Sequence, residues 1–168
     1  MRFKFLTLFA AVLLLGACET TPEETAEVEE TTQVVQPAPE PAPEPLPGPV
    51  PGSQEDLIVQ VGDRVFFAYD SSQLSFEAQS TIQALSVWMN DNPSVTLTLE
   101  GHCDERGTRE YNLALGERRA NAVGDYLVAL GINPGRVSTI SYGKERPAVP
   151  GSNESAWAQN RRGVFSVN

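Results

Sequence analysis

The chain has 168 residues, with 22 acidic side chains, 12 basic side chains and a formal charge of −10 at pH 7. Residues 19–52 contain eight glutamates and no lysine or arginine, whereas residues 53–168 have 14 acidic and 10 basic side chains. The acidic charge therefore lies mainly in the segment before residue 53, and it argues against nucleic acid as a partner. The length of the chain allows one ordinary domain.

The N-terminal segment has the layout of a secretory signal. Arg2 and Lys4 precede an apolar run over residues 5–15. This run is too short to span a bilayer as a helix, but it matches the length of a signal-peptide core. We therefore predict that the first residues are removed during export.

The sequence LGAC at residues 15–18 follows this run and resembles the lipobox of bacterial lipoproteins. The resemblance implies a signal peptide over residues 1–17 and a lipid-carrying Cys18 as the new N-terminus. The alternative is an ordinary signal peptide with a chance cysteine. Glu19, in place of the aspartate that retains lipoproteins in the inner membrane, favours the outer membrane, with the domain facing the periplasm.

Residues 18–52 show no apolar periodicity and end in the proline-rich run PAPEPAPEPLPGPVPG. Proline fixes φ and cannot donate a backbone hydrogen bond, so this composition predicts an extended, disordered tether. Fully extended at ~3.1 Å per residue, it would reach on the order of 100 Å. We predict that a separate domain occupies residues 53–168.

The first part of this domain alternates between strand and helix patterns. RVFFAYD at residues 64–70 predicts a strand. Ser75 can cap a helix that runs to about Asn90, with apolar residues at helical spacing. SVTLTLEG at residues 94–101 alternates apolar residues with threonines, which predicts a half-buried strand.

The second part continues the alternation. Thr108 can cap a long helix that runs to Leu130. Strands are predicted at residues 136–143 and 163–167, with a short helical piece over ESAWAQNRR between them. This order predicts βαβ units with two helices covering one face of a sheet.

The run EGHCDERGT at residues 100–108 places His102, Cys103 and Asp104 side by side, and these residue types occur in catalytic and metal sites. Adjacent strand residues point to opposite faces, the chain has one histidine, and no zinc-ligand spacing is present. We therefore expect no catalysis, no metal and no cofactor, and a buried packing role for Cys103. A cysteine-dependent cell-wall enzyme remains the alternative that this motif leaves open.

The same run can also be interpreted as part of a binding site. Gly107 and Thr108 lead into a helix whose unpaired N–H groups favour a carboxylate ligand. Asn112, Gly116 and Arg119 share one face of that helix. Gly116 is explained either by close approach of a ligand or by tight helix-to-sheet packing, and the spacing does not decide between them.

Four segments together resemble the OmpA-like peptidoglycan-binding domain family over about residues 64–167: FFAYDSSQL, NPSVTLTLEGHCDERGTREYNLALGERRANAVGDYL, ISYGKERPAV and WAQNRR. The lipobox and the proline-rich tether fit the lipid-anchored members. The resemblance implies an α+β fold, a two-layer βαβαβ-β sandwich whose mixed four-stranded sheet has its helices on one face. Cys103 departs from the family, which commonly has alanine or threonine at that position.

The resemblance implies noncovalent binding, without catalysis, of the peptidoglycan stem peptide through its meso-diaminopimelate. Asp104 matches the aspartate that takes the ligand's ammonium, and Arg119 matches the arginine that takes its carboxylate. Asn112 and Asp70 match positions lining the same pocket, and Arg161 is carried over from the NRR motif. His102 is expected to orient the loop.

The implied partners are peptidoglycan, periplasmic TolB, further Tol or outer-membrane proteins, and the membrane through the lipid on Cys18. The family joins the outer membrane to the cell wall and supports outer-membrane constriction at division. An envelope adaptor that binds mainly protein partners is the second alternative.

Overall fold

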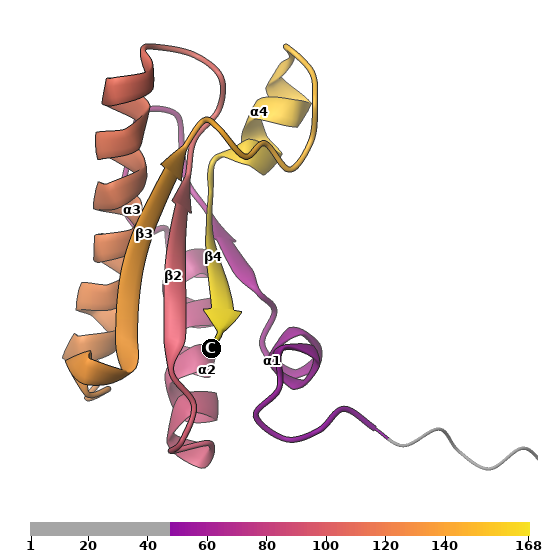
Figure 1. Cartoon of the computed structure of the whole chain (residues 1–168), viewed down its shortest axis with the longest axis vertical. Coiled ribbons are helices and arrows are strands. Elements are labelled where there is room, and N and C mark those ends of the chain that lie inside the picture. Colours follow the sequence, from indigo (N-terminus) through magenta and orange to yellow (C-terminus); the bar gives the residue numbers. More distant parts are fainter. Residues whose placement is uncertain (1–47) are drawn as a thin grey trace, which may run out of the picture. The chain divides into compact units, whose positions relative to one another are not determined.

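The computed structural model describes residues 48–168 (Figure 1). The predicted signal peptide, the lipidation site Cys18 and most of the predicted tether lie outside the described residues. Within residues 48–168, no helix combines the length and the apolar character needed to cross a membrane. The elements are α1 Gln54–Gln60, β1 Arg64–Phe66, α2 Phe76–Asp91, β2 Leu97–His102, α3 Arg109–Ala129, the 3₁₀ turn η1 Pro134–Arg136, β3 Val137–Gly143, α4 Glu154–Asn160 and β4 Arg162–Val167.

The four strands form one mixed sheet in the order β1-β4-β2-β3. The last strand, β4, is inserted between β1 and β2 and runs antiparallel to both, while β2 and β3 are parallel. Helices α2 and α3 are the crossover connections, and their buried residues share one core with Leu97, Leu99 and Phe165 of the sheet. The predicted α+β fold, with a mixed four-stranded sheet and the long helices on one face, is confirmed (Figure 1).

Both long helices begin at the residues that the sequence indicated. The Ser75 hydroxyl accepts a hydrogen bond from the backbone N–H of Ala78 at 3.1 Å. Thr108 accepts one from the N–H of Tyr111 at 3.2 Å. Each cap satisfies a donor that the first helical turn would otherwise leave unpaired.

The predicted strand over residues 64–70 was too long, because pairing ends at Phe66. Beyond Phe67, whose N–H still donates to Arg161 O at 2.9 Å, the carbonyls of Ala68 and Ser71 accept hydrogen bonds from Arg119 instead of extending the sheet. Asp70 lies in the turn after β1 with φ of 51°. The strand therefore ends just before the segment whose carbonyls accept hydrogen bonds from the buried Arg119.

Helix α1 was not predicted from the sequence. Ser53 caps it by accepting a hydrogen bond from Asp56, whose carboxylate accepts a 2.9 Å hydrogen bond from the buried indole of Trp88. Leu57 is buried, whereas Ile58 and Val59 are exposed. A seven-residue helix with one buried apolar residue has too little periodicity to be recognised in sequence.

The backbone of α3 lies very close to β2, and glycines make this possible. A Cβ placed on Gly116 would lie 2.3 Å from Ser141 Oγ and 2.8 Å from the carbonyl oxygen of Gly101. The open question about Gly116 is thereby answered in favour of helix-to-sheet packing.

The carboxyl ends of β1, β2 and β3 meet at one edge of the sheet, where α3 begins and β4 starts. Loops at this edge of an α/β arrangement are where ligands usually bind. Segments 69–71, 103–108 and 161 therefore come together although they are far apart in sequence.

Candidate binding site

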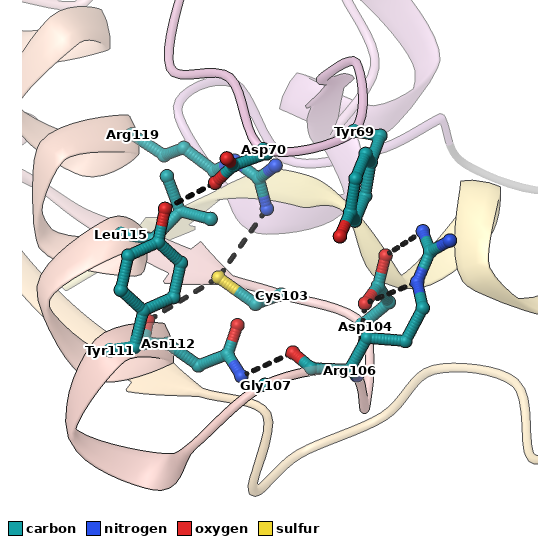
Figure 2. A pocket seen from close by; sticks show the side chains of 10 residues that line it. All are labelled: Tyr69, Asp70, Cys103, Asp104, Arg106, Gly107, Tyr111, Asn112, Leu115 and Arg119. Atoms are coloured by element: carbon teal, nitrogen blue, oxygen red, sulfur yellow. Dashed lines mark hydrogen bonds and ion pairs between the residues drawn. The ribbon is translucent and has the colours of Figure 1, made fainter.

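A cavity of about 260 Å³ opens at this edge of the sheet (Figure 2). Four of the five residues expected in the binding site line it; the fifth, Arg161, is outside the lining and lies 3.5 Å from the Asp104 carboxylate. The lining consists of Tyr69, Asp70, Cys103, Asp104, Arg106, Gly107, Tyr111, Asn112, Leu115 and Arg119.

Arg119 is completely buried beside the cavity. Its Nε donates to Ser71 O at 2.8 Å, Nη1 to His102 O at 2.8 Å, and Nη2 to Ala68 O at 3.0 Å. Among residues 48–168 no carboxylate forms an ion pair with it. Burial lowers the pKa of its guanidinium, but an arginine remains protonated at neutral pH. A fixed positive charge is thus held at the cavity wall by neutral carbonyls.

Asp104 is buried on the other side of the cavity and is already paired. Arg106 donates to it through Nη2 at 2.6 Å and through Nε at 3.2 Å. Arg161 Nη1 lies 3.5 Å from the same carboxylate. Burial alone would raise the pKa of Asp104, but the hydrogen bonds from Arg106 outweigh burial and hold the pKa below its ordinary value. Asp104 is therefore ionised over the neutral pH range.

Asp70 offers a second carboxylate to the cavity, and it is exposed. One of its oxygens accepts a hydrogen bond from the Tyr111 hydroxyl across the mouth of the cavity (Figure 2). Its left-handed φ is tolerated by aspartate better than by most residues. Asp70 thus presents a negative charge at the entrance, while the charge of Asp104 is covered.

Asn112 braces the loop that carries Asp104. Its amide nitrogen donates to the carbonyls of Arg106 at 2.8 Å and Thr108 at 3.0 Å. Its amide oxygen points into the ring of labelled side chains in Figure 2. Asn112 therefore shapes the loop through its donors and offers the cavity an acceptor.

Cys103 and His102 have the buried positions expected for strand-end packing. The Cys103 sulfur lies 3.3 Å from Asn112 O and 3.4 Å from Arg119 Nη1, whereas the His102 ring contacts Glu100 and Tyr142. Burial raises the pKa of the Cys103 thiol. A reactive cysteine needs the opposite shift, so this geometry does not activate the thiol.

His102 makes the fold sensitive to mild acid. Burial and the nearby positive charge of Arg162 lower the pKa of His102 from 6.5 to about 4. Between these values the unfolded chain takes up a proton that the folded domain does not, so stability falls as pH drops from 6.5 to 4. At about 1.4 kcal/mol per pH unit, we expect a loss of up to ~3 kcal/mol, measured by urea unfolding at pH 7 and pH 4.5.

The control for this prediction is His102→Gln, which removes the titrating group but retains polarity. Its free energy of unfolding should change much less between the two pH values, whatever its absolute stability. Equal pH dependence of wild type and variant would assign the effect to other groups.

The sequence interpretation missed Arg106, Tyr69 and Tyr111 as cavity residues. Arg106 is two residues after Asp104, and its side chain turns back onto that carboxylate. The motif DERG contains the pair, but spacing within a loop does not show which side chain folds back. Tyr69 and Tyr111 belong to the turn after β1 and to α3, so only the fold brings them together.

The model of the OmpA family matches residues 66–161. Proteins named peptidoglycan-associated lipoprotein from Agrobacterium fabrum and Rhizobium meliloti are 53% and 54% identical to this chain over 112 residues. Each match covers 67% of this chain. It covers 63% of the Agrobacterium protein and 64% of the Rhizobium protein, so this chain spans less than two thirds of the length of either relative.

Solved structures agree with these matches. The crystal structure of the peptidoglycan-associated lipoprotein from Burkholderia pseudomallei aligns with a TM-score of 0.62 and 38% identity, covering 63% of this chain and 90% of that one. The C-terminal domain of Helicobacter pylori MotB aligns with a TM-score of 0.59 at 21% identity, over 63% of this chain and 84% of that one, and supports the fold alone. The family match spans more than half of the chain and contains every residue of the cavity, so this protein belongs to the OmpA family.

Proposed function

We propose that this protein is an outer-membrane lipoprotein that holds the cell wall by noncovalent binding of the peptidoglycan stem peptide. The ligand group is the free end of meso-diaminopimelate, which carries an ammonium and a carboxylate. The names of the relatives and the chemistry of the cavity both support this function. Binding of this kind involves no bond breaking and requires no catalytic group.

The observation that carries the proposal is the buried guanidinium of Arg119. An arginine with no carboxylate partner among residues 48–168 attracts an anion. Three of its N–H groups are directed to carbonyls of different segments, which fixes its orientation. A ligand carboxylate in the cavity would provide the missing negative charge.

The ammonium of the ligand would be received by the acidic side of the cavity. Asp70 is accessible at the mouth, and Asp104 lies deeper on the loop after β2. Opposite fixed charges across a cavity of this size suit a zwitterion better than a simple anion or cation. The amide oxygen of Asn112 is the additional polar contact that we propose.

The remaining parts of the chain complete the proposal. Lipid on Cys18 would hold one end in the outer membrane, with residues 19–52 spanning the distance to the wall. TolB and other Tol or outer-membrane proteins are proposed as further partners in envelope integrity and in constriction at division. These partner assignments rest on the family resemblance.

The proposal is tested by sedimentation of the Gly48–Asn168 fragment with purified sacculi. The hydrophobic core is built from residues between Leu57 and Phe165, so this fragment contains all of it. Wild type should pellet with sacculi, and free meso-diaminopimelate should release it. Asp104→Asn should bind at least tenfold more weakly, because the charge that attracts the ammonium is lost.

Asp125→Asn is the matched control, since Asp125 is an exposed residue of α3 outside the cavity. It removes the same charge and should pellet like the wild type. Thermal unfolding of each variant shows whether it is folded. If folded Asp104→Asn pellets as well as Asp125→Asn, the proposed site is wrong.

A further inference from the structure

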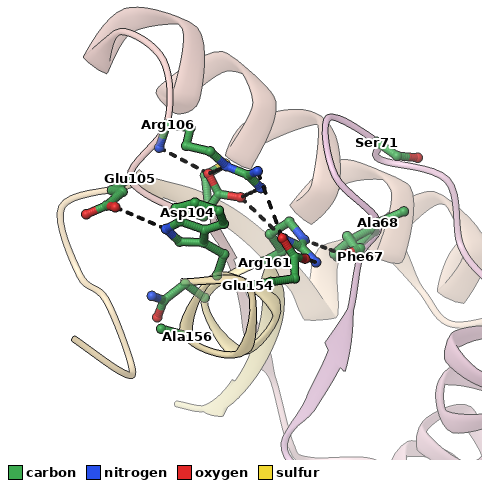
Figure 3. A network of polar contacts seen from close by, with 12 residues as sticks. Phe67, Ala68, Ser71, Asp104, Glu105, Arg106, Glu154, Ala156 and Arg161 are labelled. Atoms are coloured by element: carbon green, nitrogen blue, oxygen red, sulfur yellow. Dashed lines mark hydrogen bonds and ion pairs between the residues drawn. The ribbon is translucent and has the colours of Figure 1, made fainter. Parts of the chain in front are cut away.

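The carboxylate of Asp104 is covered by a cation of the protein itself. Asp104 is 4% exposed, and Arg106 reaches both of its oxygens, with an additional hydrogen bond from the Arg106 backbone N–H at 3.1 Å (Figure 3). An ammonium that approaches from the cavity meets a carboxylate whose strongest acceptor positions are already used. Arg106 must therefore move before Asp104 can bind the ligand closely.

Two aromatic rings hold Arg106 in this position. Its guanidinium carbon lies 4.0 Å from the ring centroid of Tyr69 and 4.1 Å from that of Trp157. Tyr69 comes from the turn after β1 and Trp157 from α4. The indole N–H of Trp157 donates to Glu105 at 3.0 Å, which ties α4 to the loop of Asp104. We refer to the two rings of Tyr69 and Trp157 as the Arg106 clamp.

The surrounding residues allow Arg106 to move away while both the Asp104 carboxylate and the Arg106 guanidinium keep an oppositely charged partner. Arg161 keeps its contact with Asp104, so the carboxylate retains one cationic partner. Glu154 is exposed; its Oε1 accepts a hydrogen bond from Arg161 at 2.8 Å, and its Oε2 lies 4.0 Å from Arg106, so Oε2 can accept the released guanidinium. Arg106 itself is 30% exposed in its side chain, which gives it room to rotate toward solvent.

We propose that Arg106 is a displaceable internal competitor of the ligand ammonium, and that the Arg106 clamp sets how often Asp104 is open. This inference rests on the proposed function and adds regulation to the same site. When only a fraction of molecules has an open site, the apparent affinity falls by that fraction. A weaker clamp raises the open fraction and tightens ligand binding, although the clamp residue Trp157 does not line the cavity.

The test replaces Trp157 with leucine and with phenylalanine. Leucine removes the π face that attracts the guanidinium, whereas phenylalanine retains it and loses only the hydrogen bond to Glu105. For a diaminopimelate-containing muropeptide, Trp157→Leu should bind roughly threefold to fivefold more tightly than wild type, with faster association. Trp157→Phe should stay close to wild type. Calorimetry gives the affinity and stopped-flow mixing gives the association rate.

A second readout follows Arg106 directly. Ligand binding should change the fluorescence of Trp157 in the wild type, because the guanidinium leaves its ring. Trp157→Phe reports the background from Trp88. If Trp157→Leu does not fold, Trp157→Met against Trp157→Phe makes the same comparison at a residue outside the cavity lining.

The outcomes separate this inference from the proposed function. Wild type that binds the muropeptide, together with a leucine variant that binds no more tightly than its phenylalanine counterpart, overturns the clamp and leaves the binding site intact. Wild type that binds no muropeptide overturns the proposed function and the clamp with it. The inference is supported if Trp157→Leu binds the muropeptide more tightly and associates faster than wild type, while Trp157→Phe does neither.

Discussion

Arg119→Met should lose binding to sacculi by about 100-fold or more, the largest functional effect expected of a single side chain. Among residues 48–168, Arg119 is the only buried cation beside the cavity that forms no ion pair. Loss of a charge-assisted, geometrically fixed contact corresponds to ~3 kcal/mol, or about two orders of magnitude in the dissociation constant. Sedimentation with sacculi over a range of protein concentrations measures the loss.

Arg119→Lys is also expected to bind poorly, although it keeps the charge. The guanidinium donates to the carbonyls of Ala68 and Ser71, in the turn after β1, and of His102, at the end of β2. A single ammonium cannot reach these three carbonyls and a ligand carboxylate together. A lysine variant with wild-type binding would show that charge alone is sufficient, against the geometry argued above.

Arg118→Met is the matched control, because Arg118 is the exposed neighbour on the same helix. It changes the net charge equally and should leave sedimentation unchanged. Thermal unfolding must show that all variants are folded at the assay temperature, since Arg119→Met leaves three carbonyls without their donor. Equal losses in both methionine variants would point to a long-range charge effect.

Gly101→Ala is expected to have the largest effect on stability. The added Cβ would lie 1.8 Å from the carbonyl oxygen of Gly116 and 2.5 Å from its carbonyl carbon. Both atoms belong to the backbone of α3, so relief requires the helix to move away from β2. We expect a loss of about 3 kcal/mol or more in the free energy of unfolding, measured by urea denaturation.

Gly124→Ala is the control for this experiment. Gly124 also faces the sheet from α3, but its added Cβ would have its nearest contact at 3.5 Å, with Leu99. Alanine is preferred to glycine within helices by up to ~1 kcal/mol, so this variant should be as stable as wild type or more so. If Gly101→Ala unfolds at the same urea concentration as Gly124→Ala, the close helix-to-sheet approach is wrong.

Local sequence patterns predicted correctly those features that depend only on neighbouring residues, such as the starts of the helices. Ser75 and Thr108 cap the helices because a hydroxyl three residues before an unpaired N–H stabilises a first turn in any fold. Strand ends were less reliable, as the strand that began at Arg64 shows. Its continuation to residue 70 depends on whether its carbonyls pair with β4 or with Arg119, and Arg119 is 48 residues from Ser71.

The sequence by itself determined the order of the four strands and of helices α2, α3 and α4, the starts of the long helices and, through its family resemblance, four residues that line one cavity. Only the tertiary structure decided which charges are paired. Asp104 forms an ion pair with Arg161, 57 residues later in the sequence, and within residues 48–168 Arg119 donates to carbonyls rather than to carboxylates. Ion pairing depends on distance and burial in the folded chain, and β4 brings Arg161 to this edge only because it inserts between β1 and β2. The sheet topology therefore decides that Asp104 has Arg161 as a second cationic partner, while Arg119 has no carboxylate partner within residues 48–168.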